Sequence, residues 1–133
     1  MIPDPIEDIR ALLLAASSVT ALVDDRVYHS ELPPAQSASM PEQAVVLALA
    51  GGGGRPKLTK IRRLRLDTIC YGATLYESQQ LHAAVREVLE AFTRLSGSLL
   101  SVEMAADGQN GRDPLKQWPV CFATYTVLAT VSV

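Results

Sequence analysis

Apolar and polar positions alternate along several stretches of this chain, and the alternation predicts strands. Between residues 62 and 71, in "RRLRLDTICY", one set of alternate positions is apolar or small and the other is mostly charged. A period of two with one apolar face is typical of a strand that is buried on one side. The last segment, "PVCFATYTVLATVSV", also alternates, but much of both faces is apolar or small. That pattern indicates a central strand or a strand that another subunit covers.

Three further stretches complete the predicted strands. The run "QAVVLALA", residues 43–50, is rich in valine and leucine and lies between a proline-containing stretch and four glycines, which favours a strand. A brief strand is expected around Val27, and "LLSVEMAA", residues 99–106, places apolar side chains on one face. We predict loops for residues 33–41, which the prolines enclose, and for "DGQNGRDPLKQW", residues 107–118.

A period near 3.6 predicts the helices. Thr74 and Glu77 have the spacing of a capping box, and one helical face then continues to about residue 95 through Leu81, Ala84, Val85, Val88, Leu89 and Phe92. Asp4 and Pro5 suit the start of a short helix, and "SVTALV" indicates a second short turn. The elements together predict an α+β fold of one domain, residues 1–133. Its mostly antiparallel or mixed sheet has about five strands, flanked on one side by one long helix and one or two short ones.

Composition and charge exclude several classes of protein. The chain has 133 residues, of which 48% are hydrophobic and 20% are charged, so it can form a single core of ordinary size. A net charge of -2 gives no overall attraction to nucleic acid or to an anionic membrane. The apolar runs are short, and "MIPDPIEDIR" lacks the positive charge and apolar stretch of a signal peptide. We therefore expect synthesis in the cytosol and no association with a membrane.

The stretch "GGGGRPK" raises the question of a phosphate-binding loop. Such a loop needs a strand before it and a helix after it, whose N-terminal amides hold the phosphates. Here a predicted strand follows the glycines, Pro56 removes one amide donor, and the spacing does not match G-x-x-x-x-G-K-[ST]. The alternative is a hairpin tip. Because four glycines lose much conformational entropy when ordered, we expect residues 51–60 to be mobile in the free subunit and to become ordered against a partner.

The titratable residues form no evident catalytic or metal-binding set. Neither histidine, His29 or His82, has a serine or cysteine linked to it in sequence, and we interpret His82 as a surface residue of the long helix. Cys70 and Cys121 fall in predicted strands without further ligands at a suitable spacing, which favours buried thiols over a zinc site. The adjacent acids at 24–25 favour a solvated turn over a metal site. We predict no catalytic residue, no metal site and no cofactor.

Basic residues gather in one hairpin arm. The chain has 12 lysines and arginines, and half of them are Arg55, Lys57, Lys60, Arg62, Arg63 and Arg65. An acidic neighbouring subunit, nucleic acid and plain solvent are the alternatives for what faces them. No aromatic side chain is interleaved with these cations, so the stacking platform typical of single-strand binding is missing, and we favour protein. Since Asp67 shares one strand face with Arg63 and Arg65, we predict that Asp67 and the six cations contact a partner or a neighbouring subunit.

Several segments, in order, resemble a known family. They are "IRALLLAASSVTALVDDRVYHSELPP", "MPEQAVVLALA" and "RLRLDTICYGATLYESQQLHAAVREVLEAF", followed by the long terminal strand. Together they resemble the tail terminator, or tail-completion, proteins of long-tailed bacteriophages (siphophages) and of related prophages and gene transfer agents. The most specific parts are "ALVDDRVY" and the junction "LDTICYGATLYESQQL", where an aromatic residue precedes a small-residue turn and a helix. The glycine-rich tip and the proline loop look like insertions, whose roles do not carry over.

The resemblance implies a structural virion protein rather than an enzyme. It implies a ring-forming subunit, usually of six copies, that caps the head-proximal end of a tail tube, stops tube polymerisation and offers the head a joining surface. The implied partners are further copies of the chain, the tail tube protein and a head-completion or connector protein, with DNA passing through the lumen without specific binding. The implied location is the virion tail or neck, after assembly in the bacterial cytoplasm. The alternatives are another head-tail connector or neck component, or a small DNA-binding module that uses the basic hairpin 55–65.

Overall fold

The computed structural model describes residues 5–49, 61–91, 99–114 and 116–130. Over these residues the fold is α+β, as predicted, and it is built on a five-stranded sheet with the strand order β1-β2-β3-β5-β4. The strands are β1 (Val27–His29), β2 (Ala44–Leu49), β3 (Ile61–Tyr71), β4 (Leu99–Arg112) and β5 (Pro119–Thr130). Strands β1 and β2 are parallel, and the other neighbours are antiparallel. The sheet is therefore mixed.

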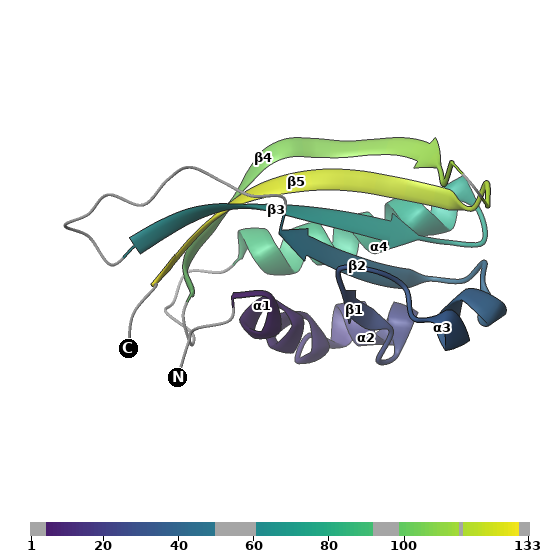
Figure 1. The fold of residues 1–133 in the computed structure, drawn as a ribbon, viewed down its shortest axis with the longest axis horizontal. Coiled ribbons are helices and arrows are strands. Elements are labelled where there is room, and N and C mark those ends of the chain that lie inside the picture. Colours follow the sequence, from purple (N-terminus) through teal and green to yellow (C-terminus); the bar gives the residue numbers. More distant parts are fainter. Residues whose placement is uncertain (1–4, 50–60, 92–98, 115, 131–133) are drawn as a thin grey trace.

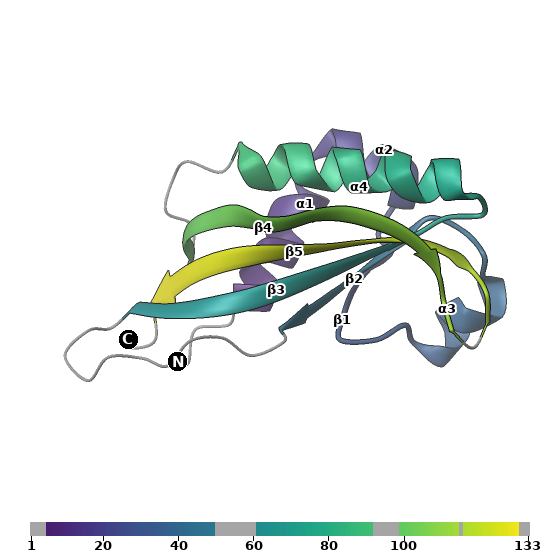
Figure 2. The ribbon, with the colours of Figure 1, turned by 90° about the horizontal axis from the view of Figure 1, so that it is seen from above.

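Three helices cover one face of this sheet. They are α1 (Pro5–Leu14), α2 (Ser17–Val23) and α4 (Leu75–Glu90), and Figures 1 and 2 show them together on the same side. A fourth short helix, α3 (Pro34–Ser39), lies on the other side near one end of the sheet (Figure 2). The prediction of helices on one side only is thus wrong for α3. We call the face under α1, α2 and α4 the helix-covered face, and the opposite one the second face.

Helix α3 occupies the stretch that was predicted as a proline-enclosed loop. Pro34 is its first residue, a position where the missing proline N–H costs nothing. The side chain of Gln36 then joins the helix to its surroundings. Its Oε1 accepts a 2.6 Å hydrogen bond from the Tyr28 hydroxyl, and its Nε2 donates one of 2.6 Å to Glu42. These tertiary bonds hold a helix that is too short to form on its own.

Helix α4 begins as its capping box predicts. The Thr74 hydroxyl accepts a hydrogen bond of 3.2 Å from the N–H of Glu77, and the Glu77 carboxylate accepts one of 3.3 Å from the N–H of Ala73. The apolar stripe packs on the sheet: Leu81, Val85 and Leu89 are buried, and Ala84 and Val88 are partly buried. Phe92 and the predicted end of the helix near residue 95 lie outside the described residues.

The core lies between the helices and the helix-covered face. Its largest fully buried side chains come from both layers: Ile6, Ile9 and Leu13 of α1, Leu81 and Leu89 of α4, and Leu47, Leu66 and Tyr125 of the sheet. In β3 the residues Leu64, Leu66, Thr68 and Cys70 are buried, so the predicted alternation is confirmed. Strand β5 lies between β3 and β4, which confirms it as a central strand of the sheet.

The motif "ALVDDRVY" forms the turn from α2 into the sheet. Asp24 has a positive φ of 57°, which aspartate tolerates better than most residues, and Val27 is buried. Arg26 bridges β1 and the start of β2, because its Nε donates to the carbonyl of Gln43 at 2.8 Å and lies 3.7 Å from the Glu42 carboxylate. The motif therefore has a structural role in joining the first helices to the sheet.

Strand β4 is longer than the sequence pattern predicts. It continues through residues 107–112, which were predicted as loop, and the turn to β5 occupies the remainder. Its register against β5 shifts at three places, between Leu99 and Ser101, between Met104 and Ala106, and between Ala106 and Gln109. Each bulge breaks the period of two, and an edge strand with one neighbour tolerates glycine and asparagine. The loop prediction for residues 107–112 is therefore wrong.

Candidate partner-binding face

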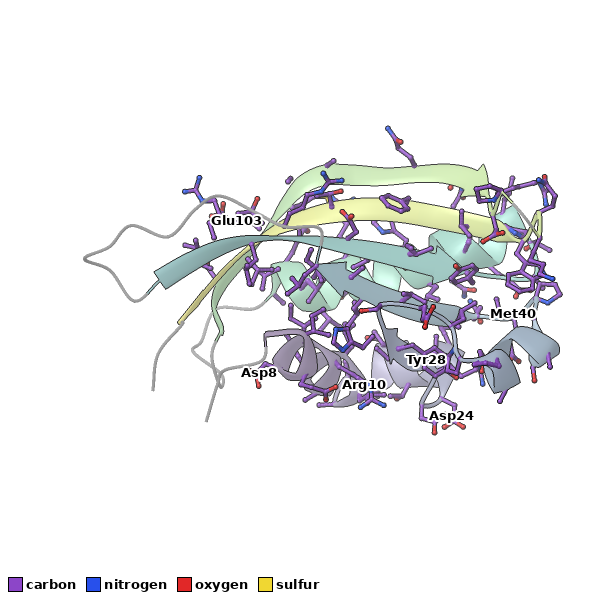
Figure 3. The ribbon with its side chains drawn as sticks, in the orientation of Figure 1. Asp8, Arg10, Asp24, Tyr28, Met40 and Glu103 are labelled. Carbon is purple, nitrogen blue, oxygen red and sulfur yellow. The ribbon has the colours of Figure 1, made fainter. Side chains whose placement is uncertain are left out.

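The second face of the sheet carries a polar strip at the end where β3 begins. We define the polar strip as the outward residues of three adjacent strands: Arg63, Arg65, Asp67, Glu103, Thr124 and Thr126. Register pairs Arg65 with Thr126 and Thr126 with Glu103, so these side chains form a row across the sheet. Figure 3 shows Glu103 toward this end, while Tyr28 and Met40 lie toward the other end, where β3 finishes.

Asp67 organises the polar strip. It is only 9% exposed, and a buried carboxylate needs hydrogen-bond partners. One of its oxygens accepts from the Nε of Arg65 at 3.1 Å and from the hydroxyl of Thr124 at 3.0 Å. The Arg65 side chain remains 54% exposed, so its guanidinium is held in place but still faces solvent. The arrangement can present fixed positive charge to a partner surface.

The predicted contact residues are placed only in part. The structure puts Arg63, Arg65 and Asp67 on the face opposite Leu64 and Leu66, with both arginines exposed. Arg62 belongs to β3, but its side chain lies outside the described part of the chain. The same holds for the whole of residues 50–60, which include Gly51–Gly54, Arg55, Lys57 and Lys60. The prediction that these residues contact a partner stays a prediction.

An open pocket lies at the other end of the second face. We call it the aromatic pocket. The pocket has a volume of about 370 Å³. We call the apolar part of its lining the floor and the polar part the rim: the floor is Leu32, Val46, Ile69, Tyr71 and Trp118, and the rim is Ser30, Glu31, Asp113 and Lys116. Tyr71 and Trp118 meet edge to face with ring centroids 6.2 Å apart, a favourable geometry for two aromatic rings. Burial, reinforced by the charge of Asp113, raises the pKa of Tyr71, so its hydroxyl is neutral at physiological pH.

The aromatic pocket is not predicted by the sequence pattern. Its lining comes from four separate segments of the chain, which only the tertiary fold brings together. One signal was present in β3, whose outward positions change from charged at Arg63, Arg65 and Asp67 to apolar at Ile69 and Tyr71. Phe122 pairs with Ile69 on the neighbouring strand and is 38% exposed, so it extends the apolar surface beyond the pocket.

His82 is a core residue, which corrects the interpretation of it as a surface residue. It is only 8% exposed, and Ser78, one turn earlier on α4, is fully buried. The buried side of the helix is therefore wider than its apolar stripe. The space for the imidazole comes from Gly108 of β4, where a Cβ would lie 2.6 Å from His82 Nε2 and 2.8 Å from Cys121 Sγ. A side chain on Gly108 would collide with the ring.

Both cysteines are free thiols buried in the core, as predicted. Cys70 and Cys121 are register partners on β3 and β5. Burial, together with the neighbouring Cys121, raises the pKa of the Cys70 thiol far above its ordinary value of 9.0. Among the described residues, no group of three or more histidine, cysteine or acidic side chains is arranged to hold a metal ion. Within the same residues, no helix is long and apolar enough to cross a membrane.

Comparison with solved structures finds the same fold in a chain of a gene transfer agent particle and in a bacteriophage protein. One match, at a TM-score of 0.64 and 17% identity, is a chain of the virion of a native gene transfer agent particle, and it covers 95% of this chain and 94% of that one. Another, at a TM-score of 0.54 and 15% identity, is the gp17 protein of bacteriophage SPP1, with 95% and 87% covered. No protein-family model and no curated protein matches the sequence. At these identities the likeness shows a shared fold.

Proposed function

We propose that this chain is a structural protein of a phage-like tail or neck, folded as one domain over its whole length. The observation that carries the proposal is the fold shared with a gene transfer agent virion chain over 95% of this chain. The likeness to a bacteriophage SPP1 protein supports the same class. The role requires no catalytic residue and no cofactor, in keeping with what the sequence led us to expect.

The finer role that we propose is that of a tail terminator. Copies of the chain would close into a ring, of six subunits by the resemblance in sequence, on the last tube ring at the head-proximal end. This would end polymerisation and present a joining surface to a head-completion or connector protein, while DNA passes through the lumen without specific contacts. The second face supports such a role, because it offers the charged polar strip and the open aromatic pocket to partners. A closed ring needs two different patches of this kind on each subunit.

The mass of the native particle tests the proposal. We expect sedimentation or light scattering to give a closed oligomer for the protein alone, or on addition of the tail tube protein of the same particle. We also expect this chain to shorten the tubes that form when it is present during tube polymerisation. A protein that remains a monomer and leaves tube length unchanged would contradict the terminator role.

A DNA-binding module is the alternative function, because the basic residues of the hairpin 55–65 could also contact phosphates. The described part of the arm does not distinguish DNA from a protein partner, because Arg65 pairs with Asp67 on the sheet but remains 54% exposed. DNA binding through phosphate contacts predicts an affinity that falls steeply with salt. A gel-shift assay at two salt concentrations separates the two functions, since the structural role requires no shift at either concentration.

A further inference from the structure

The aromatic pocket combines an apolar floor with a mainly acidic rim. Among the described lining residues, Leu32, Ile69 and Trp118 belong to the floor, while the rim has two acids, Glu31 and Asp113, and one cation, Lys116. Asp113 also holds the turn before β5, because its carboxylate accepts from the N–H of Lys116 at 2.8 Å. The Glu31 residue is exposed. The ligand chemistry that fits is an apolar side chain with positive charge on both sides of it.

We propose that this pocket binds the segment Arg55–Lys60 of a second copy of this chain. The inference rests on the self-assembly contained in the proposed function. The segment reads "RPKLTK" and holds three cations, no acid and one leucine. Leu58 supplies the apolar side chain for the floor, and Lys57 and Lys60, which stand on its two sides in the sequence, supply the positive charge for Glu31 and Asp113. Opposite charges of this kind fix the register of an interface and speed its formation.

The segment cannot reach the pocket of its own subunit. Leu58 stands three residues before Ile61, where β3 begins, so it extends at most about 10 Å from that point. The pocket lies at Ile69 and Tyr71, and the eight residues from Ile61 to Ile69 span about 26 Å of strand. Figure 1 shows β3 running along the molecule from one end to the other. The contact must therefore join two copies.

The contact has a defined symmetry. The donor segment belongs to the start of β3 and the acceptor pocket to its end, so each subunit uses two different patches. Such head-to-tail contacts close into rings when the rotation permits it. This makes the aromatic pocket a determinant of ring closure rather than a site for a small molecule. Tyr71 and Trp118 line the pocket, and this agrees with a role in assembly because aromatic side chains often anchor protein interfaces.

A peptide experiment tests the contact directly. Trp118 is the only tryptophan of the chain and lies in the pocket floor, so its fluorescence reports occupancy. A synthetic peptide of residues 53–60 is expected to change the Trp118 emission in a saturable way. The same peptide carrying Leu58→Ser is expected to bind at least about tenfold more weakly, a difference of about 1.4 kcal/mol. Equal responses to both peptides, or none up to about 1 mM, would overturn the proposal.

A charge exchange in the full-length chain gives the second test. Glu31→Lys and Lys57→Glu should each weaken self-association by about tenfold or more, and the double variant should recover most of the loss. Glu87→Lys, the same charge change at an exposed position of α4, serves as the matched control and should have little effect. Unchanged association in Glu31→Lys would overturn the pocket contact while leaving ring formation intact. A monomer that still binds the peptide would instead overturn the proposed function and keep the pocket.

Discussion

At the scale of single residues, the packing around Gly108 makes the sharpest stability prediction. A Cβ at this position would lie within 2.8 Å of side-chain atoms of both His82 and Cys121, and both of those residues are buried. Gly108→Ala should therefore lower the free energy of unfolding by about 1 to 3 kcal/mol, the usual cost of overpacking. Urea unfolding followed by circular dichroism measures it.

Gly111 in the same strand is the matched control for that substitution. A Cβ there would meet no atom within 4 Å, so Gly111→Ala should change the free energy of unfolding by less than about 1 kcal/mol, with stabilisation as the more usual sign. Equal effects of the two substitutions would show that the close approach of β4 to His82 is wrong.

The buried thiol of Cys70 predicts a pH dependence. Its pKa is raised in the folded state by burial, so the native protein keeps a proton that the unfolded chain releases. The stabilising contribution is complete below the ordinary value of 9.0 and is lost progressively as the pH rises above it. Between about pH 9.5 and about pH 11, the slope should amount to about 1.4 kcal/mol per pH unit.

Cys70→Ala should remove that slope, and urea unfolding under reducing conditions at several pH values measures it. The pKa of Tyr71 is also raised by burial, so its ionisation adds a slope above pH 10, but this contribution is common to both proteins and cancels in the comparison. The quantity compared is the change of the free energy of unfolding with pH, not the absolute stability of the variant. Parallel pH curves for the two proteins would contradict the assignment of a protonated, buried thiol.

The arginines of the polar strip give a prediction about assembly. Arg63→Glu with Arg65→Glu reverses two exposed charges on the second face and removes the ion pair between Arg65 and Asp67. The Arg65 side chain is largely exposed, but Asp67 is buried and loses this partner, so the two substitutions should lower the free energy of unfolding by about 1 to 3 kcal/mol. Association with copies or with the tail tube should weaken while the fold remains. Unchanged oligomer mass and unchanged tail joining would count against the polar strip as a contact surface.

At the scale of elements, the packing of α4 can be tested on its buried stripe. Leu81 is fully buried against the sheet, so Leu81→Ala should cost about 2 to 5 kcal/mol through lost transfer energy and a residual cavity. Gln79, two residues earlier, is exposed, and Gln79→Ala should change the stability by less than about 0.5 kcal/mol. Thermal or urea unfolding compares the two. A loss below about 1 kcal/mol at Leu81 would mean that the assigned face is wrong.

Elements whose apolar residues repeat on one face could be predicted from the sequence, and elements without such a repeat could not. The first half of β3 alternates between charged and apolar residues because one of its faces packs in the core, and the capping residues Thr74 and Glu77 mark the start of α4. The second half of β4 was missed because bulges interrupt its period and because residues such as Gly108 and Asn110 are more typical of turns. Helix α3 was missed because tertiary bonds through Gln36, rather than any local pattern, hold it.

The candidate site also has one part that the sequence predicts and another part that it does not. The β3 part of the polar strip could be anticipated, since Arg63, Arg65 and Asp67 follow one face of a single strand. The aromatic pocket could not, because Leu32, Val46 and Trp118 are far apart in the sequence and meet only in the fold. The burial of His82 was missed for a related reason. Its space is provided by a glycine on another element, and nothing within α4 indicates it.

At the scale of the whole molecule, the two faces of the sheet have different roles. The helix-covered face is filled by the apolar core, so stability resides there. Among the described residues, the second face is only partly covered, by segments beside α3 whose Leu32 and Met40 pack with Tyr71 and Val120. It leaves the polar strip at one end of β3 and the aromatic pocket at the other. A subunit with distinct patches at its two ends is suited to head-to-tail association.

This separation predicts that salt affects assembly more than folding. Raising the ionic strength from about 0.1 M to about 1 M shortens the Debye length from about 10 Å to about 3 Å. Contacts between the basic arm and acidic groups of a partner should therefore weaken, while the apolar core is little affected. Oligomer mass by sedimentation should fall with salt, and the thermal midpoint should move by only a few degrees.

Deleting residues 52–57 removes Arg55 and Lys57. The deletion should leave the thermal midpoint nearly unchanged, weaken association and make association less dependent on salt. Association that is equally strong and equally salt-sensitive in the deletion variant would show that other charges hold the copies together.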